Sequence, residues 1–272
     1  MTSKLAICFF GITRSLSHTI ESIEVNILGA AQCVCEPVVL SHFFDQKWIN
    51  NPRSGEKGAV RADEHALLEN DWLRLEKPDA CLQTWDYKGL QQFGDAWDDD
   101  FQSLRNLVHQ LHSLNAVCEE ALKRGVEVCI FCRPDLRYHD SLLRPLKRAI
   151  RRGGDVVYLP GWQAWEGGLN DRFAICVGRK AIAAYGQRIQ DAGAFCKEAN
   201  RPLHAERLLE YALSSRGIKV KKIKTRASRI RIDGTMPAVD IFRSPVWKVS
   251  AKVAQSLGVK SFVQRVLGRF LR

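Results

Sequence analysis

Leu5-Ala-Ile-Cys-Phe-Phe10 is an uninterrupted apolar run that ends at Gly11. A strand that is apolar throughout is typical of the buried interior of a parallel sheet, and the glycine indicates a tight turn after it. The segment that follows carries apolar residues at helical spacing, and residues 38–44 form a second strand-like run. This order of strand, turn, helix and strand predicts the opening β–α–β unit of a parallel α/β sheet.

The rest of the chain continues this alternation. Residues 101–124 place apolar side chains on one helical face, and residues 126–132 are almost wholly apolar up to Arg133-Pro134-Asp135. Residues 218–232 alternate apolar and basic side chains, which indicates an edge strand or an extended arm. We therefore predict a Rossmann-type, mostly parallel sheet flanked by helices, with further strands at 156–159 and 173–177 and further helices at 61–75, 142–150, 180–189 and 205–215.

Charge is distributed unevenly along the chain. The net charge is +11, and residues 216–272 contain 15 Lys or Arg against two acids, so the first 215 residues carry a net charge of −2. A neutral body is not typical of a domain that binds nucleic acid across its main face, whereas the basic tail needs an anionic partner. Because the first apolar run has only six residues, too short for a secretory signal, we expect a cytosolic protein.

The nine cysteines offer two close pairs, Cys33 with Cys35 and Cys129 with Cys132. Neither pair has the second pair or the histidines that a zinc site needs. Most of the cysteines lie in apolar runs, where a reduced thiol packs as a small hydrophobic group. We predict reduced thiols in a reducing compartment.

Three polar clusters follow predicted strands, at residues 11–15, 133–140 and 167–172. Ligands of open α/β sheets bind outside the carboxyl ends of the strands, so we expect the clusters to converge on one edge of the sheet. In the first cluster, Gly11, Thr13 and Arg14 lie where a strand turns into a helix, and the amide groups of such a turn favour an anion. We assign these three residues to phosphate binding.

The second cluster contains Arg133, Asp135 and Arg137. A carboxylate directly after a buried strand can hold Mg²⁺ or Mn²⁺ against a diphosphate, which makes Asp135 the candidate metal ligand. Arg133 and Arg137 can contact phosphate with their fixed fork of donors. The alternative is a local Arg–Asp ion pair that closes the turn.

The third cluster follows Trp162 and Trp165, whose flat faces suit stacking on a sugar or a base. Asp171 is the candidate base for an acceptor hydroxyl, and Glu166 is the alternative carboxylate. The other reading is a turn-rich loop in which Asn170 and Asp171 cap the next element. The remaining candidates are weaker: the run Asp98-Asp-Asp100 is interpreted as a helix cap, and no partners are visible for His42, His109, His112 and His204.

Several of these stretches together resemble a bacterial family of GT-A-like glycosyltransferases found with polysaccharide biosynthesis genes. The matching pieces are residues 7–14, residues 101–104, Arg133-Pro-Asp135 and Gly168-Leu-Asn-Asp-Arg-Phe-Ala174, which together cover roughly residues 4 to 220. The resemblance implies a GT-A-like fold and a nucleotide-sugar donor, with Arg14 near the phosphates and Asp135 in the place of the metal-binding carboxylate. It places Asp171 beside the donor sugar or acceptor, and we add Asn170 and Arg172 to the donor-binding residues. Pro134 departs from the usual Asp-x-Asp metal motif.

We divide the chain into a catalytic domain, residues 1–217, and a basic extension, residues 218–272. In the extension, residues 259–270 carry an apolar helical face with cations elsewhere, a pattern typical of a helix that adsorbs to an anionic bilayer. A helix packed on the body is the alternative. The expected function is transfer of a sugar to a glycan or lipid-linked acceptor at the cytoplasmic membrane surface, without specific nucleic-acid binding. A nucleic-acid- or polyanion-binding protein and a scaffold without catalysis are the rival hypotheses.

Overall fold

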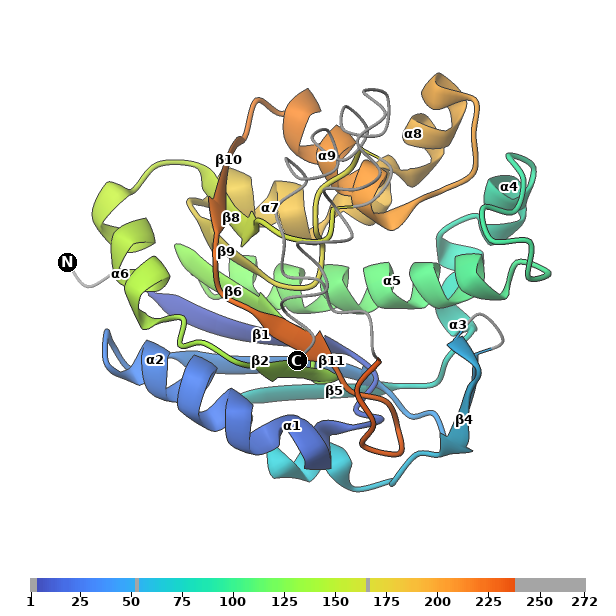
Figure 1. The fold of residues 1–272 in the computed structure, drawn as a ribbon. Coiled ribbons are helices and arrows are strands. Elements are labelled where there is room, and N and C mark those ends of the chain that lie inside the picture. The colour runs from blue at the N-terminus through green and yellow to red at the C-terminus, as the bar shows by residue number, and fades with distance from the viewer. Residues whose placement is uncertain (1–3, 52–53, 165–166, 238–272) are drawn as a thin grey trace, which may run out of the picture.

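The structure, a computed structural model, describes residues 4–51, 54–164 and 167–237. Its centre is a seven-stranded sheet with the strand order β10-β8-β9-β6-β1-β2-β5 (Figure 1). Only β9 runs antiparallel to its neighbours, so the predicted mostly parallel sheet is confirmed. The strands of this sheet are β1 Leu5–Gly11, β2 Val38–Phe44, β5 Trp72–Glu76, β6 Val128–Cys132, β8 Val156–Pro160, β9 Ala174–Val177 and β10 Lys219–Ile223.

The alternating side chains of β1 divide the apolar core into two layers. Leu5, Ile7 and Phe9 pack on one face of the sheet beneath α1 (Leu16–Ile23), η1 (Glu24–Leu28), α2 (Gly29–Gln32) and α6 (Leu143–Arg152). The residues between them pack on the other face beneath α5 (Gln102–Lys123), α7 (Arg179–Gly186) and α9 (Ala205–Ser215) (Figure 1). Both faces are covered, which explains why the sequence of β1 has no polar position.

A third apolar cluster lies beyond the carboxyl ends of the strands. The first half of α5 extends past the strands and packs there against α4 (Tyr87–Gln91) and α8 (Ala192–Ala199). Asp99 accepts hydrogen bonds from the Ser103 N–H at 3.0 Å and the Ser103 hydroxyl at 2.7 Å, so the interpretation of the Asp98–Asp100 run as a helix cap is confirmed. Two short elements, α3 (Ala80–Thr84) and η4 (Arg188–Asp191), complete this region.

The prediction of a helix over residues 61–75 is wrong. This segment holds one short 3-10 helix, η3 (Glu64–Leu67), and then the edge strand β5, whose Leu73 pairs with Ser41 of β2. The composition of the segment favours a helix, but residues 72–76 form a strand because they pair with β2, which is distant in the sequence. Local propensity carries no information about such a distant partner.

The basic segment after residue 217 begins as part of the body. Strand β10 is the edge strand beside β8, and β11 (Ala227–Arg229) pairs antiparallel with β7 (Leu136–Tyr138). The predicted boundary at 217/218 therefore falls immediately before a strand of the main sheet. The predicted amphipathic helix at 259–270 lies outside the described residues.

A small hairpin, β3 (Trp48–Asn51) with β4 (Glu56–Ala59), stands beside the carboxyl ends of β1 and β2 (Figure 1). All nine cysteines are free, and seven of them are buried, as predicted for packed thiols. In the described part of the chain, every helix is too short or too polar to cross a membrane.

Candidate functional site

A cleft of about 550 Å³ opens at the carboxyl ends of β1 and β6. The register pairs Phe9 with Cys132, so the turn after β1 lies beside the turn after β6. Gly11 begins the first turn with a φ of +109°, a conformation suited to glycine, and its N–H donates to the Ser113 Oγ at 2.8 Å. The predicted convergence of strand ends thus produces a real concavity.

Arg14, Arg133 and Asp135 meet in this cleft. Arg133 donates to both carboxylate oxygens of Asp135, at 2.9 and 2.6 Å, and Arg14 donates to Oδ2 at 2.7 Å. Burial alone would raise the pKa of Asp135, but the guanidinium groups of Arg133 and Arg14 outweigh burial and hold this pKa well below its ordinary value. The local Arg133–Asp135 ion pair that the sequence analysis gave as the alternative is therefore present. Arg14 also bonds to the same carboxylate.

Asp171 reaches the same cleft because β9 is antiparallel. Ala174 pairs with Phe131, so the residues just before β9 lie beside those that follow β6. Asp171 is 8% exposed and its carboxylate accepts from Gln110 Nε2 at 3.3 Å, while Gln110 Oε1 accepts from Arg133 at 2.9 Å. One hydrogen-bonded chain therefore links the two polar clusters that the sequence placed on separate loops.

A buried arginine lies behind Asp171. Arg188 is fully buried, stacks on the Tyr185 ring at 4.6 Å and donates to the Tyr185 carbonyl at 2.7 Å. Its Nη2 lies 3.7 Å from Asp171 Oδ2, and within the described ranges Nε and Nη2 have no hydrogen-bond partner. The guanidinium thus places a positive charge directly behind the carboxylate that faces the cleft.

The end of β11 and the residues directly after it supply cations that the sequence analysis missed. Arg229 and Arg231 line the cleft, and Arg231 bonds to Glu56 at 3.1 Å. Glu56 is 5% exposed and also pairs with Arg14 at 3.2 Å. The signal in the sequence was the alternation Arg229-Ile230-Arg231, which in an extended strand puts both arginines on one face.

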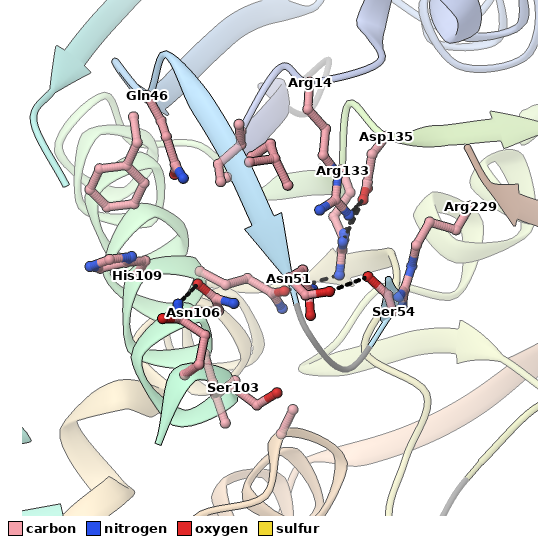
Figure 2. Close-up of a pocket in the computed structure, with 18 of the residues that line it drawn as sticks. Arg14, Gln46, Asn51, Ser54, Ser103, Asn106, His109, Arg133, Asp135 and Arg229 are labelled. Atoms are coloured by element: carbon pink, nitrogen blue, oxygen red, sulfur yellow. Dashed lines mark hydrogen bonds and ion pairs between the residues drawn. The ribbon is translucent and has the colours of Figure 1, made fainter. Parts of the chain in front are cut away.

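The opposite wall of the cleft is rich in side-chain amides and was also missed. Figure 2 shows Gln46 and Asn106 across from Arg14, Arg133 and Asp135, with Asn51 between them. On α5, Ser103, Asn106 and Gln110 recur at helical spacing within an otherwise apolar face, which is a polar stripe readable from the sequence. The cleft amides are Gln46, Asn50, Asn51, Gln102, Asn106 and Gln110.

Four predicted donor-binding residues do not line the cleft. Thr13 is buried and its carbonyl accepts from Leu16, whereas Arg137 is exposed on β7 and donates to the His18 carbonyl. Asn170 is 2% exposed, and its amide bonds to the Trp162 carbonyl and the Arg172 N–H, so it organises the loop as the alternative reading held. Arg172 lies over the Trp162 ring. Glu166 is outside the described residues.

Trp162 is not a stacking platform for a ligand. Its side chain is 2% exposed, and its Nε1 donates to the Thr225 carbonyl at 2.8 Å. The ring belongs to the core beneath β8 and β9. Trp165 lies outside the described residues, so the stacking hypothesis for it stays a prediction.

The histidines do have partners, contrary to the sequence analysis. His42 and His112 both reach Glu76, with their Nε2 atoms 3.1 and 3.3 Å from its Oε2, and His109 lies 3.0 Å from Asp79. Burial lowers the pKa of His42 to about 4 despite the nearby carboxylate, so the ring is neutral at pH 7.

His42, Glu76 and His112 form the one trio in the described part of the chain with the spacing of metal ligands. The Trp85 indole N–H donates to His112 Nδ1 at 2.9 Å, so the neutral His112 ring carries its proton on Nε2, facing Glu76. Arg74 also approaches Glu76 at 2.9 Å. Donors thus surround the carboxylate, and the trio is better explained as a hydrogen-bonded network outside the cleft than as a metal centre.

No model of a protein family matches the chain, and no curated protein matches its sequence. Among solved structures it is similar to mouse xyloside xylosyltransferase 1 in the apo form, with 10% identity, a TM-score of 0.46, and coverage of 81% of this chain and 85% of that one. A second is galactosyltransferase LgtC with donor and acceptor sugar analogues, at 11% identity and a TM-score of 0.43, covering 81% and 73%. A third is a Bacillus anthracis protein assigned as a glucose-1-phosphate thymidylyltransferase, in complex with sucrose, at 8% identity and 0.41, covering 84% and 89%.

Proposed function

We propose that the cleft transfers a sugar from a nucleotide-diphosphate donor to the hydroxyl group of a glycan or lipid-linked acceptor. The observation that carries the proposal is that Arg14, Arg133, Asp135 and Asp171 line one cleft at the carboxyl ends of the parallel strands. Cations for a diphosphate and a carboxylate for a hydroxyl proton therefore lie together. The resemblance of Arg133-Pro-Asp135 and residues 168–174 to glycosyltransferase sequences supports the same reaction.

The two walls of the cleft suit the two parts of such a donor. The arginines on one side match the diphosphate, because a guanidinium presents a planar fork of donors to phosphate oxygens. The amides on the other side carry both donors and acceptors, which suits the hydroxyl groups of a ribose or a sugar. A nucleotide sugar would span both walls.

In the proposed reaction, the acceptor hydroxyl oxygen forms a bond to the anomeric carbon while the bond from that carbon to the diphosphate oxygen breaks. Asp171 accepts the hydroxyl proton, and the diphosphate leaves with the electron pair. Arg14 and Arg133 face the charge that develops on the leaving group. Gln110 links Asp171 to Arg133 and so fixes the base relative to the phosphate site.

Release of free nucleotide from a panel of UDP-, GDP- and CMP-sugars tests the proposal. We expect turnover of at least one sugar-nucleoside diphosphate by the full chain, faster with a glycan acceptor than with water. Binding of a donor without turnover would indicate a scaffold that has lost catalysis. Binding of polyanions with steep salt dependence, and of no donor, would favour the rival nucleic-acid-binding hypothesis.

The placement at the cytoplasmic face of a membrane rests on residues 238–272 in this proposal. Their sequence combines an apolar helical face with cations, each of which contributes about 1 kcal/mol to adsorption on an anionic bilayer. Residues 219–231 of the extension belong to the sheet and the cleft instead. The membrane segment would therefore begin after Pro237 rather than after Gly217.

Co-sedimentation with liposomes tests this placement. A chain that ends at Pro237 keeps β10 and β11, and we expect it to lose the binding to anionic liposomes that the full chain shows. Neutral liposomes are the control, because they lack the surface charge that attracts Lys and Arg. Equal sedimentation of the two chains would show that residues 238–272 are not the anchor.

A further inference from the structure

The carboxylate that the sequence offers to a metal ion is already occupied. Asp135 is 2% exposed, and its oxygens accept three guanidinium hydrogen bonds at 2.6 to 2.9 Å. Mg²⁺ and Mn²⁺ need carboxylate oxygens that are free to enter the coordination shell. A cation at Asp135 would also lie against two positive charges. The residues present therefore do not fit the metal that the family resemblance implies.

The rest of the cleft does not replace this ligand. Among the residues that the structure describes, the trio with metal-ligand spacing is His42, Glu76 and His112, and none of these three lines the cleft. Asp171, a second carboxylate that lines the cleft, is bonded to Gln110 and lies against Arg188. Within the described ranges, Asp135 belongs to no group of three His, Cys, Asp or Glu side chains with the spacing of metal ligands.

Guanidinium groups instead gather around Asp135. Four arginines (Arg14, Arg133, Arg229 and Arg231) surround two carboxylates (Asp135 and Glu56) in the described residues. Burial and then the neighbouring Arg133 guanidinium lower the pKa of Arg229 to about 9, which is the effect expected of cations crowded together.

These guanidinium groups remain reachable. The side chains of Arg14, Arg133 and Arg231 are 11%, 15% and 19% exposed, and all three line the cleft. Asp135 and Glu56 hold them from behind, at 2% to 3% side-chain exposure. The acids therefore serve to position the arginines, and the outward edges of the arginines are left for a ligand.

We propose that the cleft binds the diphosphate of its donor through guanidinium groups alone, with Arg14, Arg133 and Arg231 in the place of a divalent cation. This inference rests on the proposed function, because it concerns the same donor. The planar guanidinium forks match the oxygens of a nucleoside diphosphate leaving group. The arginines would stabilise its charge as the bond to the sugar breaks.

Equilibrium binding of UDP and GDP to the full chain, by calorimetry, tests the proposal without any turnover. We expect the same Kd within about twofold in EDTA, in Mg²⁺ and in Mn²⁺. Arg14→Gln should weaken binding about tenfold to a hundredfold, as expected for loss of hydrogen bonds to a charged group. Arg14→Lys should fall between, because it keeps the charge and loses the fork.

Arg148→Gln is the matched control, since Arg148 is exposed on α6 outside the cleft and its replacement removes the same charge. Arg231→Gln provides a second cleft variant should Arg14→Gln melt at a much lower temperature. Binding that appears only with Mn²⁺ or Mg²⁺ would overturn the guanidinium proposal and leave sugar transfer standing. Unchanged binding in both cleft variants would overturn it as well. Failure of both nucleotides to bind under every condition would reject the proposed function itself.

Discussion

Asp171→Asn is expected to lower donor turnover by about 10²- to 10⁴-fold, the usual contribution of a positioned general base. Asp171 is the carboxylate that faces the cleft while linked through Gln110 to the phosphate-binding arginines. Asparagine keeps the shape and can still accept from Gln110, but it cannot take a proton. The measurement is kcat for the best donor of the panel, together with the Kd for the free nucleoside diphosphate, which should change little.

Asp140→Asn is the control for that experiment. Asp140 accepts from Arg226 in an exposed ion pair outside the cleft, so the same chemical change there should leave kcat unaltered. Thermal melting of both variants shows whether Arg188 tolerates the loss of its partner. A folded Asp171→Asn protein with turnover within about twofold of the wild type would remove Asp171 from the mechanism.

The second large effect concerns stability. Asp135→Asn is expected to lower the free energy of unfolding at pH 7 by about 3–5 kcal/mol, because it leaves buried guanidinium groups without their carboxylate. The folded-state pKa of Asp135 is held well below its unfolded value of about 4, so the ionised group stabilises the fold above that pH. That stabilisation is lost as the pH falls further below about 4.

Urea unfolding at pH 7 and pH 3 measures both parts of this prediction. The difference between wild type and Asp135→Asn should be large at pH 7 and should narrow at pH 3, with similar slopes against urea. Asp140→Asn again serves as the control, since an exposed ion pair contributes about 1 kcal/mol or less. A difference below about 1 kcal/mol at pH 7, or one that widens in acid, would contradict the buried ion cluster.

The fold was predictable where the chain is buried on both sides. β1 and β6 are apolar at every position before their turns, and α5 carries an apolar face along its whole length, so local pattern and tertiary position agree. The failure at residues 61–75 occurred at the sheet edge, where the alternation Leu73-Arg74-Leu75-Glu76 is only four residues long and leaves both leucines exposed. There the pairing with β2 decides the structure, and that partner is distant in sequence.

The site was predictable at strand ends and not beyond them. Arg14, Asp135 and Asp171 were placed on one edge because parallel strands bring their carboxyl ends together. Gln110 enters from the middle of a helix, and Arg231 comes from a segment whose basic composition suggested a solvent-exposed tail. Trp162 shows the converse case, because an aromatic ring in a polar loop looks available until the packing over it is known.

A crystal soaked with a nucleoside diphosphate in the presence of EDTA tests the central claim most directly. The account predicts that both phosphates lie within hydrogen-bond distance of Arg14 and Arg133, that the nucleoside or sugar end extends along the amide wall, and that Asp171 faces the anomeric position. A nucleotide bound elsewhere on the molecule, or a cleft that stays closed to it at saturating concentration, would contradict sugar transfer at this site.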